Sequence, residues 1–413
     1  MRSLSPASEE KVFLFLSVGI VYSLLIWPLL NSLLIVAIFA FWLIFSSKRF
    51  PALKSQQMLL VIFSLMYILP LIGITYTSNL NEGLFRLQQK APLLIFPIIF
   101  ATTNAFTHNS IKIILTHFVI ATFAACTLSL IASLIYYITA GDINAFSMPR
   151  LYLFKGGYPY IIGAFCITAI SICFSWIRSI GSRRKDYIII AIVILSVYTL
   201  LLSVRVIIAC WCLLILVNCF KLVKNTKMRF LLSLVLLVIM VVAVNVVPVL
   251  NRQWKELTTL QTDRIPLDKD ASLGRSWGGG AIRIAIWESS RELRTRNWLT
   301  GVGTGDIQDS LQQAYRDHKF YFASEHNRYN AHNQFLQVLI GHGIGGTIAL
   351  IISIILPLSI QFIKTKNLLY SSFLFLFGAL CFTEVILDIN KGVVWYSFFN
   401  SIFAFTDSKL SRI

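Results

Sequence analysis

The sequence predicts an all-α, polytopic membrane protein with about twelve transmembrane helices and one large outer loop that carries short helices. Only 13% of its residues are charged and 57% are hydrophobic, whereas a soluble protein carries about 25% charged residues. Apolar runs of about 17–25 residues, each long enough to span a bilayer, recur along the chain. One polar stretch, residues 251–331, separates the last three runs from the others.

The apolar runs divide the chain into three parts. Residues 1–250 hold nine predicted spans, 251–331 form the large loop, and 332–413 hold a re-entry helix and three further spans. The first run has no small-residue cleavage site after it, so we interpret it as a retained helix. The predicted spans are 12–27, 31–46, 57–77, 91–106, 112–138, 159–177, 186–203, 206–222, 230–250, 344–363, 368–387 and 391–406.

Lysine and arginine in the short loops predict the orientation, because these residues gather on the cytoplasmic side. With a cytoplasmic N-terminus, eighteen of them lie in cytoplasmic segments, both termini are cytoplasmic and the large loop is outside. The net charge of +18 is spread over many loops, so we expect a lipid bilayer and no nucleic acid as partner. The six basic residues of the short outer segments are Arg86, Lys90, Arg150, Lys155, Arg205 and Lys391.

Neither the cysteines nor the carboxylates form a recognisable metal site. All seven cysteines fall within apolar runs, where we expect them to act as small buried hydrophobes. The outer loops hold no cluster of carboxylates. We therefore expect neither a metal nor another cofactor.

Glycine clusters near the large loop do not match nucleotide-binding motifs. Segment 301–305 (Gly-Val-Gly-Thr-Gly) has no strand–turn–helix unit around it, and segment 277–280 (Trp-Gly-Gly-Gly) lacks the Gly-Lys-Ser/Thr of a phosphate-binding loop. We expect both to allow tight turns or a close approach of two backbones. The glycines of segment 341–346 should let the re-entering chain pack closely against a neighbouring helix.

Two short helices are expected in the large loop, at 281–296 and 308–320. Arg283 and Trp287 stand four residues apart and therefore share one helix face. The planar guanidinium of Arg283 is suited to grip a phosphate group. The alternative is a surface arginine that pairs with Glu288 or another acid of the loop.

His332 is the candidate general base, and its neighbour Asn333 is a candidate substrate-binding residue. A neutral imidazole near its unperturbed pKa takes a proton from a hydroxyl nucleophile. The position at a helix start also favours an anionic ligand. The alternative is a histidine that only bonds the backbone at a helix start.

The other candidate site residues are basic and lie near the outer surface. Arg205 stands between two apolar runs with almost no loop, where a charge is costly and should face a polar cavity or a partner; otherwise it snorkels to the headgroups. Arg150, Lys155 and Arg86 are either substrate-binding residues or headgroup anchors. Three further charged residues near an outer helix end are expected to pair with one another: Glu384, Asp388 and Lys391.

Three motifs together resemble the O-antigen ligase / O-antigen polymerase superfamily. They are Arg283-Ile-Ala-Ile-Trp287, then Leu299-Thr-Gly301-Val-Gly303-Thr-Gly305, then His332-Asn333-Gln-Phe335-Leu336-Gln-Val-Leu339-Ile-Gly341-His-Gly343-Ile-Gly345. The resemblance extends to the topology, with one large outer loop before the last helices. Two positions depart from it: His342, where relatives often carry an acid, and Phe335, where tyrosine is common.

The resemblance implies glycosyl transfer on the periplasmic face of a bacterial inner membrane. The donor would be a glycan on undecaprenyl pyrophosphate, and the ligase branch would pass it to the lipid A–core, without metal or nucleotide sugar. By the resemblance His332 is the general base, and Arg205 and Arg283 bind the pyrophosphate.

The resemblance leaves alternatives open. A polymerase joins repeat units that are still lipid-linked, although the chain length and the single dominant outer loop favour a ligase. A relative that glycosylates proteins is a third possibility. From a different class, a lipid-linked oligosaccharide transporter would suit twelve spans, but it would need neither a folded outer loop nor a base, and the sequence has no internal repeat.

Overall fold

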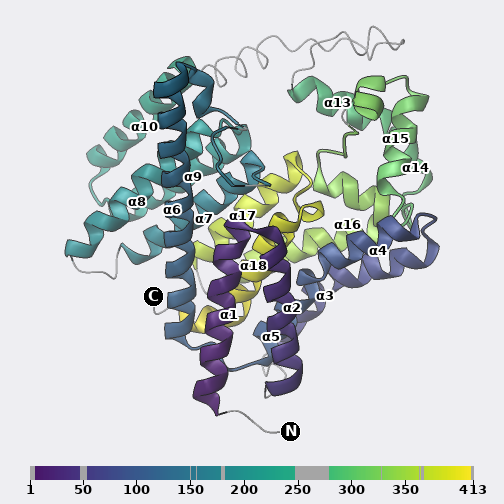
Figure 1. The fold of residues 1–413 in the computed structure, drawn as a ribbon, viewed down its shortest axis with the longest axis horizontal. Coiled ribbons are helices and arrows are strands. Elements are labelled where there is room, and N and C mark those ends of the chain that lie inside the picture. The colour runs from purple at the N-terminus through teal and green to yellow at the C-terminus, as the bar shows by residue number, and fades with distance from the viewer. Residues whose placement is uncertain are drawn as a thin grey trace.

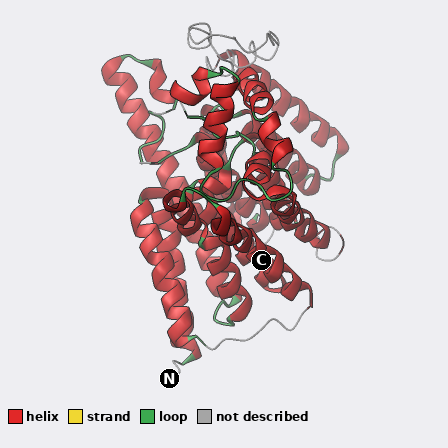
Figure 2. Cartoon of the chain, turned by 90° about the vertical axis from the view of Figure 1, so that its right-hand side faces the viewer, coloured by secondary structure: helices red, strands yellow, loops and turns green. Residues whose placement is uncertain are grey.

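The computed structural model describes residues 5–46, 54–148, 150–154, 156–177, 182–246, 279–326, 328–361, 363 and 367–410. Within these ranges all regular structure is helical (Figures 1 and 2), so the all-α prediction is confirmed. Much of the large loop, 251–278, lies outside the described residues, together with Lys155.

Each predicted span corresponds to one helix. By length and composition, seven helical stretches among the described residues qualify to cross a membrane, one of them formed by α4 (Leu80–Lys90) together with α5. The multi-pass membrane class is therefore confirmed, whereas the number twelve stays a prediction. The twelve helices are α1 (Pro6–Ile26), α2 (Pro28–Phe45), α3 (Lys54–Gly73), α5 (Pro92–Thr102), α6 (His108–Ala140), α7 (Pro159–Trp176), α8 (Ser182–Leu201), α9 (Arg205–Leu222), α10 (Thr226–Val246), α16 (Gln334–Ile360), α17 (Leu368–Thr383) and α18 (Asn390–Leu410).

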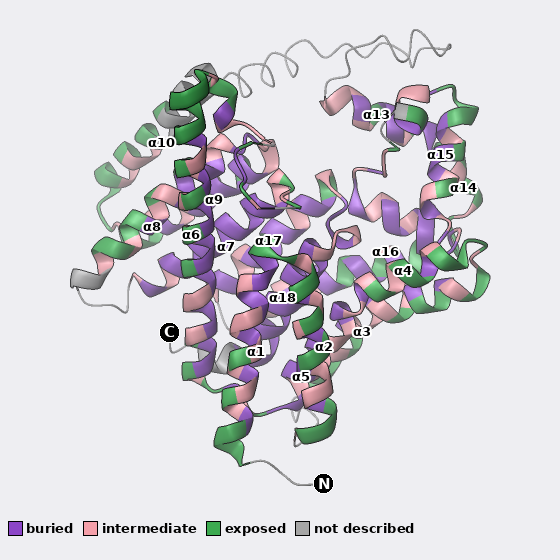
Figure 3. Ribbon diagram, viewed as in Figure 1, coloured by how far each residue is buried: buried purple, intermediate pink, exposed green. Residues whose placement is uncertain are grey.

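Helices α7, α17 and α18 form the centre of the molecule, as the concentration of buried residues in Figure 3 shows. Helix α18 packs against α5, α17 and α1, and its aromatic side chains are buried among them. Helix α7 presents small residues, and Gly163 lets Ile207 of α9 come close. Because lipid tails are as apolar as leucine, this close packing rather than the hydrophobic effect holds such helices together.

The described part of the large loop forms a small helical unit beside α16 (Figure 1). Its helices are α13 (Gly279–Ser289), α14 (Arg291–Arg296) and α15 (Ile307–Asp317), so the helix expected at 281–296 is broken after Ser289. The apolar sides of α13 and α15 meet in a separate core that includes Ile286, Leu311 and Tyr315. The division of the chain into three domains stays a prediction.

Helix α16 is interrupted at Gly343, whose φ of 61° and ψ of −160° are not helical. An interrupted helix leaves backbone groups without their usual partners four residues away. Here the glycine loop, residues 297–305, supplies the missing partners. Val302 N–H donates to the Ile340 carbonyl at 2.8 Å, Gly303 N–H to the Gly341 carbonyl at 3.1 Å, and Ile344 N–H to the Trp298 carbonyl at 2.8 Å.

The other side of the glycine loop contacts the end of α3. Thr304 Oγ1 donates to the Pro70 carbonyl at 2.6 Å, and Gly305 N–H donates to Thr77 Oγ1 at 2.9 Å. The loop thus lies between two helices at backbone distance. A Cβ on Gly301 would lie 2.3 Å from the carbonyl carbon of Gly341, and one on Gly343 would lie 2.1 Å from the Leu299 carbonyl oxygen. The close backbone approach expected for segment 301–305 is confirmed.

We predict that Gly301→Ala destabilises the protein strongly. Gly301 has a φ of +74° and no room for a methyl group. A strained backbone conformation at one residue costs roughly 1–3 kcal/mol of folding free energy, and the loss of hydrogen bonds in the loop adds to this. Gly345→Ala is the matched control, because a Cβ there meets nothing within 4 Å. Thermal unfolding in detergent should show a clear loss for the first variant only. Equal unfolding temperatures would contradict this account of the glycine loop.

Candidate active site

The site begins at the C-terminus of α17, where the last carbonyl groups of the helix have no partner within it. Asn333 Nδ2 donates to the Phe382 carbonyl at 3.2 Å, and Arg283 donates from Nη2 and Nε to the Thr383 carbonyl at 3.1 and 3.3 Å. The unpaired end of one helix therefore brings together two predicted site residues that come from α13 and from the start of α16.

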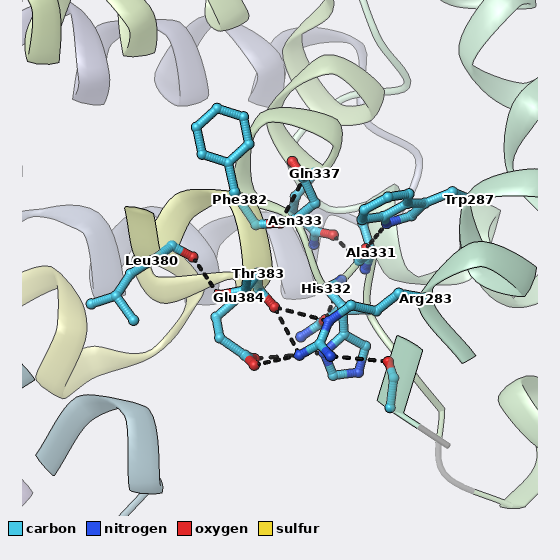
Figure 4. A network of polar contacts seen from close by, with 12 residues as sticks. Arg283, Trp287, Ala331, His332, Asn333, Gln337, Leu380, Phe382, Thr383 and Glu384 are labelled. Atoms are coloured by element: carbon cyan, nitrogen blue, oxygen red, sulfur yellow. Dashed lines mark hydrogen bonds and ion pairs between the residues drawn. The ribbon is translucent and has the colours of Figure 1, made fainter. Parts of the chain in front are cut away.

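Arg283, Glu384 and His332 form a cluster just beyond this helix end (Figure 4). Arg283 Nη2 lies 2.8 Å from Glu384 Oε1, and His332 Nδ1 lies 3.6 Å from Glu384 Oε2. The first distance is a charge-assisted hydrogen bond, and the second is too long for a hydrogen bond. Glu384 thus orients the arginine and faces the histidine. The alternative prediction, that Arg283 pairs with Glu288, is wrong.

His332 precedes the helix instead of lying within it. Asn333 is the N-cap of α16, and its Oδ1 accepts from Leu336 N–H at 3.0 Å. The φ of His332 is 45°, a left-handed conformation that costs a non-glycine residue roughly 1–3 kcal/mol. Its ring packs beside Tyr329 with the centroids 5.3 Å apart, and its side chain is 23% exposed. The histidine is therefore held in a strained conformation and remains accessible.

Trp287 holds the backbone of the residue that precedes His332. Its Nε1 donates to the Ala331 carbonyl at 3.0 Å, so Arg283 and Trp287 of α13 both reach the segment around His332, as their shared helix face predicts. The contact is to backbone. The role of Trp287 in binding substrate stays a prediction.

An apolar groove runs along α16 and α17, next to the segment that carries His332 and Asn333. Its volume is about 750 Å³, and Trp287, Asn333 and Arg294 lie at its polar end. Ile351 and Ile355 of α16 and Phe382 at the end of α17 line the rest. The groove therefore connects two neighbours of the cluster, Trp287 and Asn333, to the surfaces of helices that are apolar enough to lie in a membrane.

Asp388 and Lys90 form a second, more deeply buried ion pair next to the site. Their charged atoms are 2.9 Å apart, and their side chains are 11% and 6% exposed. Burial raises the pKa of Asp388, but the charge and the hydrogen bond of Lys90 outweigh this, so the pKa lies below its usual value and the carboxyl is ionised. Glu384, Asp388 and Lys391 were expected to pair with one another. The two acids instead pair with other cations, Glu384 with Arg283 and Asp388 with Lys90, while Lys391 Nζ donates to the Leu25 carbonyl at 3.1 Å and its pairing with an acid stays a prediction.

Arg205 is the first residue of α9 and lies at the same end of the bundle as Glu384. The pocket between α9 and α17 brings Lys221, near the end of α9, beside Leu368, the first residue of α17. The two helices are therefore antiparallel. Since a helix rises 1.5 Å per residue, the sixteen residues back to Arg205 and the sixteen forward to Glu384 reach about the same level.

The remaining predicted site residues have other surroundings. Arg86 pairs with Glu82 at 2.6 Å and donates to the Asp388 carbonyl at 3.4 Å. Arg150 pairs with Asp142, and its guanidinium lies over the ring of Tyr136 at 4.7 Å. Lys155 lies outside the described residues. The structure thus gives Arg86 and Arg150 local acidic partners and does not join them to the Arg283–Glu384–His332 cluster.

Glu384 is the site residue that the sequence interpretation missed. It was assigned to a local pair near an outer helix end, whereas its partner Arg283 is 101 positions away. The available signal was an acid directly after an apolar run, because an ionisable group at that depth needs a partner. Which partner it takes depends on the tertiary structure.

Part of the chain matches a known protein family. Residues 187–351 match the family model described as O-antigen ligase. The comparison with curated proteins gave no match to the chain. The matched segment contains Arg205, Arg283 and His332, and confirms the resemblance to the O-antigen ligase / O-antigen polymerase superfamily. Proteins of this family are membrane enzymes that transfer lipid-linked glycans.

We predict that Arg283→Lys lowers glycan transfer by more than tenfold. Lysine keeps the charge but loses the planar fork that contacts Glu384 and Thr383 together. The control is Arg316→Lys, because Arg316 is exposed and donates only to Gln313 within its own helix. The measurement is the initial rate of transfer by purified protein at equal amounts of folded enzyme. Full activity of Arg283→Lys would leave this arginine a structural role only.

Proposed function

We propose that the protein is an O-antigen ligase. It moves O-antigen polysaccharide from undecaprenyl pyrophosphate to the lipid A–core oligosaccharide on the periplasmic face of the inner membrane. The observation that carries the proposal is the Arg283–Glu384–His332 cluster, in which His332 directly precedes Asn333, a residue at the polar end of a groove along membrane helices. In this proposal His332 is the base and Arg283 the cation, and both lie where the lipid-linked donor meets an acceptor that arrives from the water.

The geometry supports a direct displacement at the anomeric carbon. His332 takes the proton of the acceptor hydroxyl, the new glycosidic bond forms, and the bond from the anomeric carbon to the pyrophosphate oxygen breaks. If Nδ1 of His332 carries its hydrogen toward Glu384, then Nε2 is the acceptor of that proton. Glu384 stabilises the imidazolium that results, as the acid of a catalytic triad does.

Arginine side chains stabilise the leaving pyrophosphate in this proposal. Arg283 lies in the cluster, and Arg205 lies at the same level of the bundle. Preorganised cations at the place where charge develops supply a large share of a catalytic effect. Two of the nearby carboxylates are paired with cations, Glu384 with Arg283 and Asp388 with Lys90, and Glu288 lines the groove. We therefore propose a reaction without metal or cofactor, and we expect glycan transfer to continue in the presence of EDTA.

The groove supports a lipid chain as part of the donor. Apolar side chains of α16 and α17 line it, and the polar end carries Trp287 and Asn333. The pyrophosphate would lie at the polar end and the isoprenoid chain along the helices. Arg86, Arg150 and Lys155 stay predicted substrate-binding residues, and the ion pairs of the first two favour headgroup anchoring for them.

A polymerase is the second candidate, because the matched family model does not separate it from a ligase. The single dominant loop favours the ligase. A transporter is disfavoured by the match to a family of glycan-transferring enzymes.

Deleting the gene should leave bare lipid A–core and accumulate lipid-linked polymer. Complementation with the wild-type gene should restore the ladder, and His332→Ala at equal protein level should not, since loss of a general base costs roughly 10²–10⁴-fold. The measurement is the electrophoretic ladder of lipopolysaccharide. Core carrying one repeat unit in the deletion strain would identify a polymerase, and a full ladder with His332→Ala would remove the base.

The proposed orientation is tested by cysteine labelling in intact cells. Thr295→Cys, on exposed α14, should react with a membrane-impermeant thiol reagent from the periplasm. Lys224→Cys, in the exposed connection between α9 and α10, should react only after the inner membrane is opened. The wild-type chain measures the background of its seven cysteines. The reverse pattern would place the site on the cytoplasmic face.

A further inference from the structure

The conformation of His332 depends on the residue before it. Ala331 is buried, and both its peptide groups are bonded to side chains. Trp287 Nε1 donates to its carbonyl at 3.0 Å, and Gln337 Oε1 accepts from its N–H at 3.1 Å. Asn330 Oδ1 accepts from His332 N–H at 2.9 Å. The positive φ of His332, which residues with a side chain rarely adopt, is thus held by these bonds.

Gln337 is buried, and the direction of its side-chain amide is set by a neighbouring ion pair. Its Nε2 donates to Asp388 Oδ2 at 2.9 Å, and Asp388 Oδ1 lies 2.9 Å from Lys90 Nζ. Gln337 and Lys90 are buried. Because an ionised carboxylate can only accept hydrogen bonds, Asp388 turns the NH₂ group of Gln337 toward itself. The amide oxygen is then left to face Ala331.

We propose that Gln337 is a positioning residue for His332, and that the Lys90–Asp388 ion pair sets the direction of its amide. Gln337 touches neither the histidine ring nor Glu384 in the bonds described; it acts through the Ala331 peptide. The part of this proposal that concerns catalysis rests on the proposed function, in which His332 is the base. The part that concerns the place of the imidazole does not.

Asp388, which accepts the hydrogen bond of the Gln337 amide, has three further charged or titratable groups near it. Asp388 comes from the connection between α17 and α18, and two of its neighbours, Lys90 and Arg86, come from α4. The third is His342, which lies farther along α16 and lines one small pocket together with Lys90. His332, which follows Ala331, faces Glu384. A carboxyl group introduced at position 337 would therefore meet Asp388 first.

Gln337→Glu tests the direction of the amide. An ionised carboxyl at this position cannot donate to Asp388, and two adjacent carboxylates hold a shared proton so that one pKa is raised. Once protonated, the introduced group again donates to Asp388 and accepts from Ala331 N–H. We expect at least a tenfold lower transfer rate than wild type near pH 8, and a ratio of variant to wild type that rises severalfold toward pH 6. Dividing the rate of the variant by that of wild type at each pH removes the effect of His332 protonation, because both proteins share it.

Gln337→Met removes both hydrogen bonds and has no titratable group. Because a small misplacement of a catalytic group costs about 10²-fold, we expect kcat to fall by that order while KM for the donor is unchanged. Its ratio to wild type should not vary with pH. Gln334→Glu is the matched control: this glutamine is also buried on α16, and its Oε1 accepts from Leu387 N–H at 2.7 Å, away from segment 330–333. Its ratio to wild type should vary less with pH than that of Gln337→Glu, because the introduced carboxyl accepts from Leu387 N–H and does not replace a donor to Asp388.

All rates are taken per folded molecule, with thermal unfolding measured for each variant. A wild-type rate for Gln337→Met, or the same pH response for Gln337→Glu and Gln334→Glu, overturns the proposal. If the wild-type protein transfers no glycan, the proposed function fails instead. The place of the imidazole is then measured by the rate at which diethyl pyrocarbonate acylates His332, with His332→Ala as the blank. Gln337→Met should change that rate severalfold, and an unchanged rate refutes the positioning role.

Discussion

The pairing of the glycine loop with the interrupted helix α16 connects the outer helices to the membrane helices. Val302 and Gly303 complete hydrogen bonds that the break at Gly343 leaves open, and they do so at a distance that admits no Cβ at Gly301. Helices α14 and α15 flank this loop in the chain, and α13 packs against both, so the position of the loop limits where the three helices lie. Arg283 reaches the end of α17 only because α13 is held there.

The site is built from the ends of helices, where backbone groups need partners from elsewhere. The last carbonyls of α17 receive Asn333 and Arg283, and the N-terminus of α16 is capped by Asn333. These contacts stabilise the fold and also bring Glu384 against His332. The structural roles of Arg283 and Asn333 are therefore compatible with the catalytic role proposed for the first and the substrate-binding role predicted for the second, because the same contacts would serve both.

Helices were predictable from the sequence because apolar runs of membrane length have few other structures available. His332 and Arg283 were predictable as site residues because they are polar groups in recognisable motifs near membrane helices. Glu384 was not, since nothing local marks its pairing with a residue 101 positions away. The glycines of segment 341–346 indicated close packing, but not that Gly343 alone takes the left-handed φ or that its partner is a loop. Nor did the pattern indicate the break after Ser289.

The segment that carries the family signature is not a self-sufficient unit. It ends at residue 351, before the acids Glu384 and Asp388, and begins after Lys90. The acids that pair with Arg283 and Gln337, and the acid that faces His332, thus come from parts of the chain outside the recognisable region. An exchange of this segment between two relatives would transfer Arg283, His332 and Gln337 without the acids that contact or face them. Divergence in the flanking helices can therefore alter the chemistry while the signature itself stays intact.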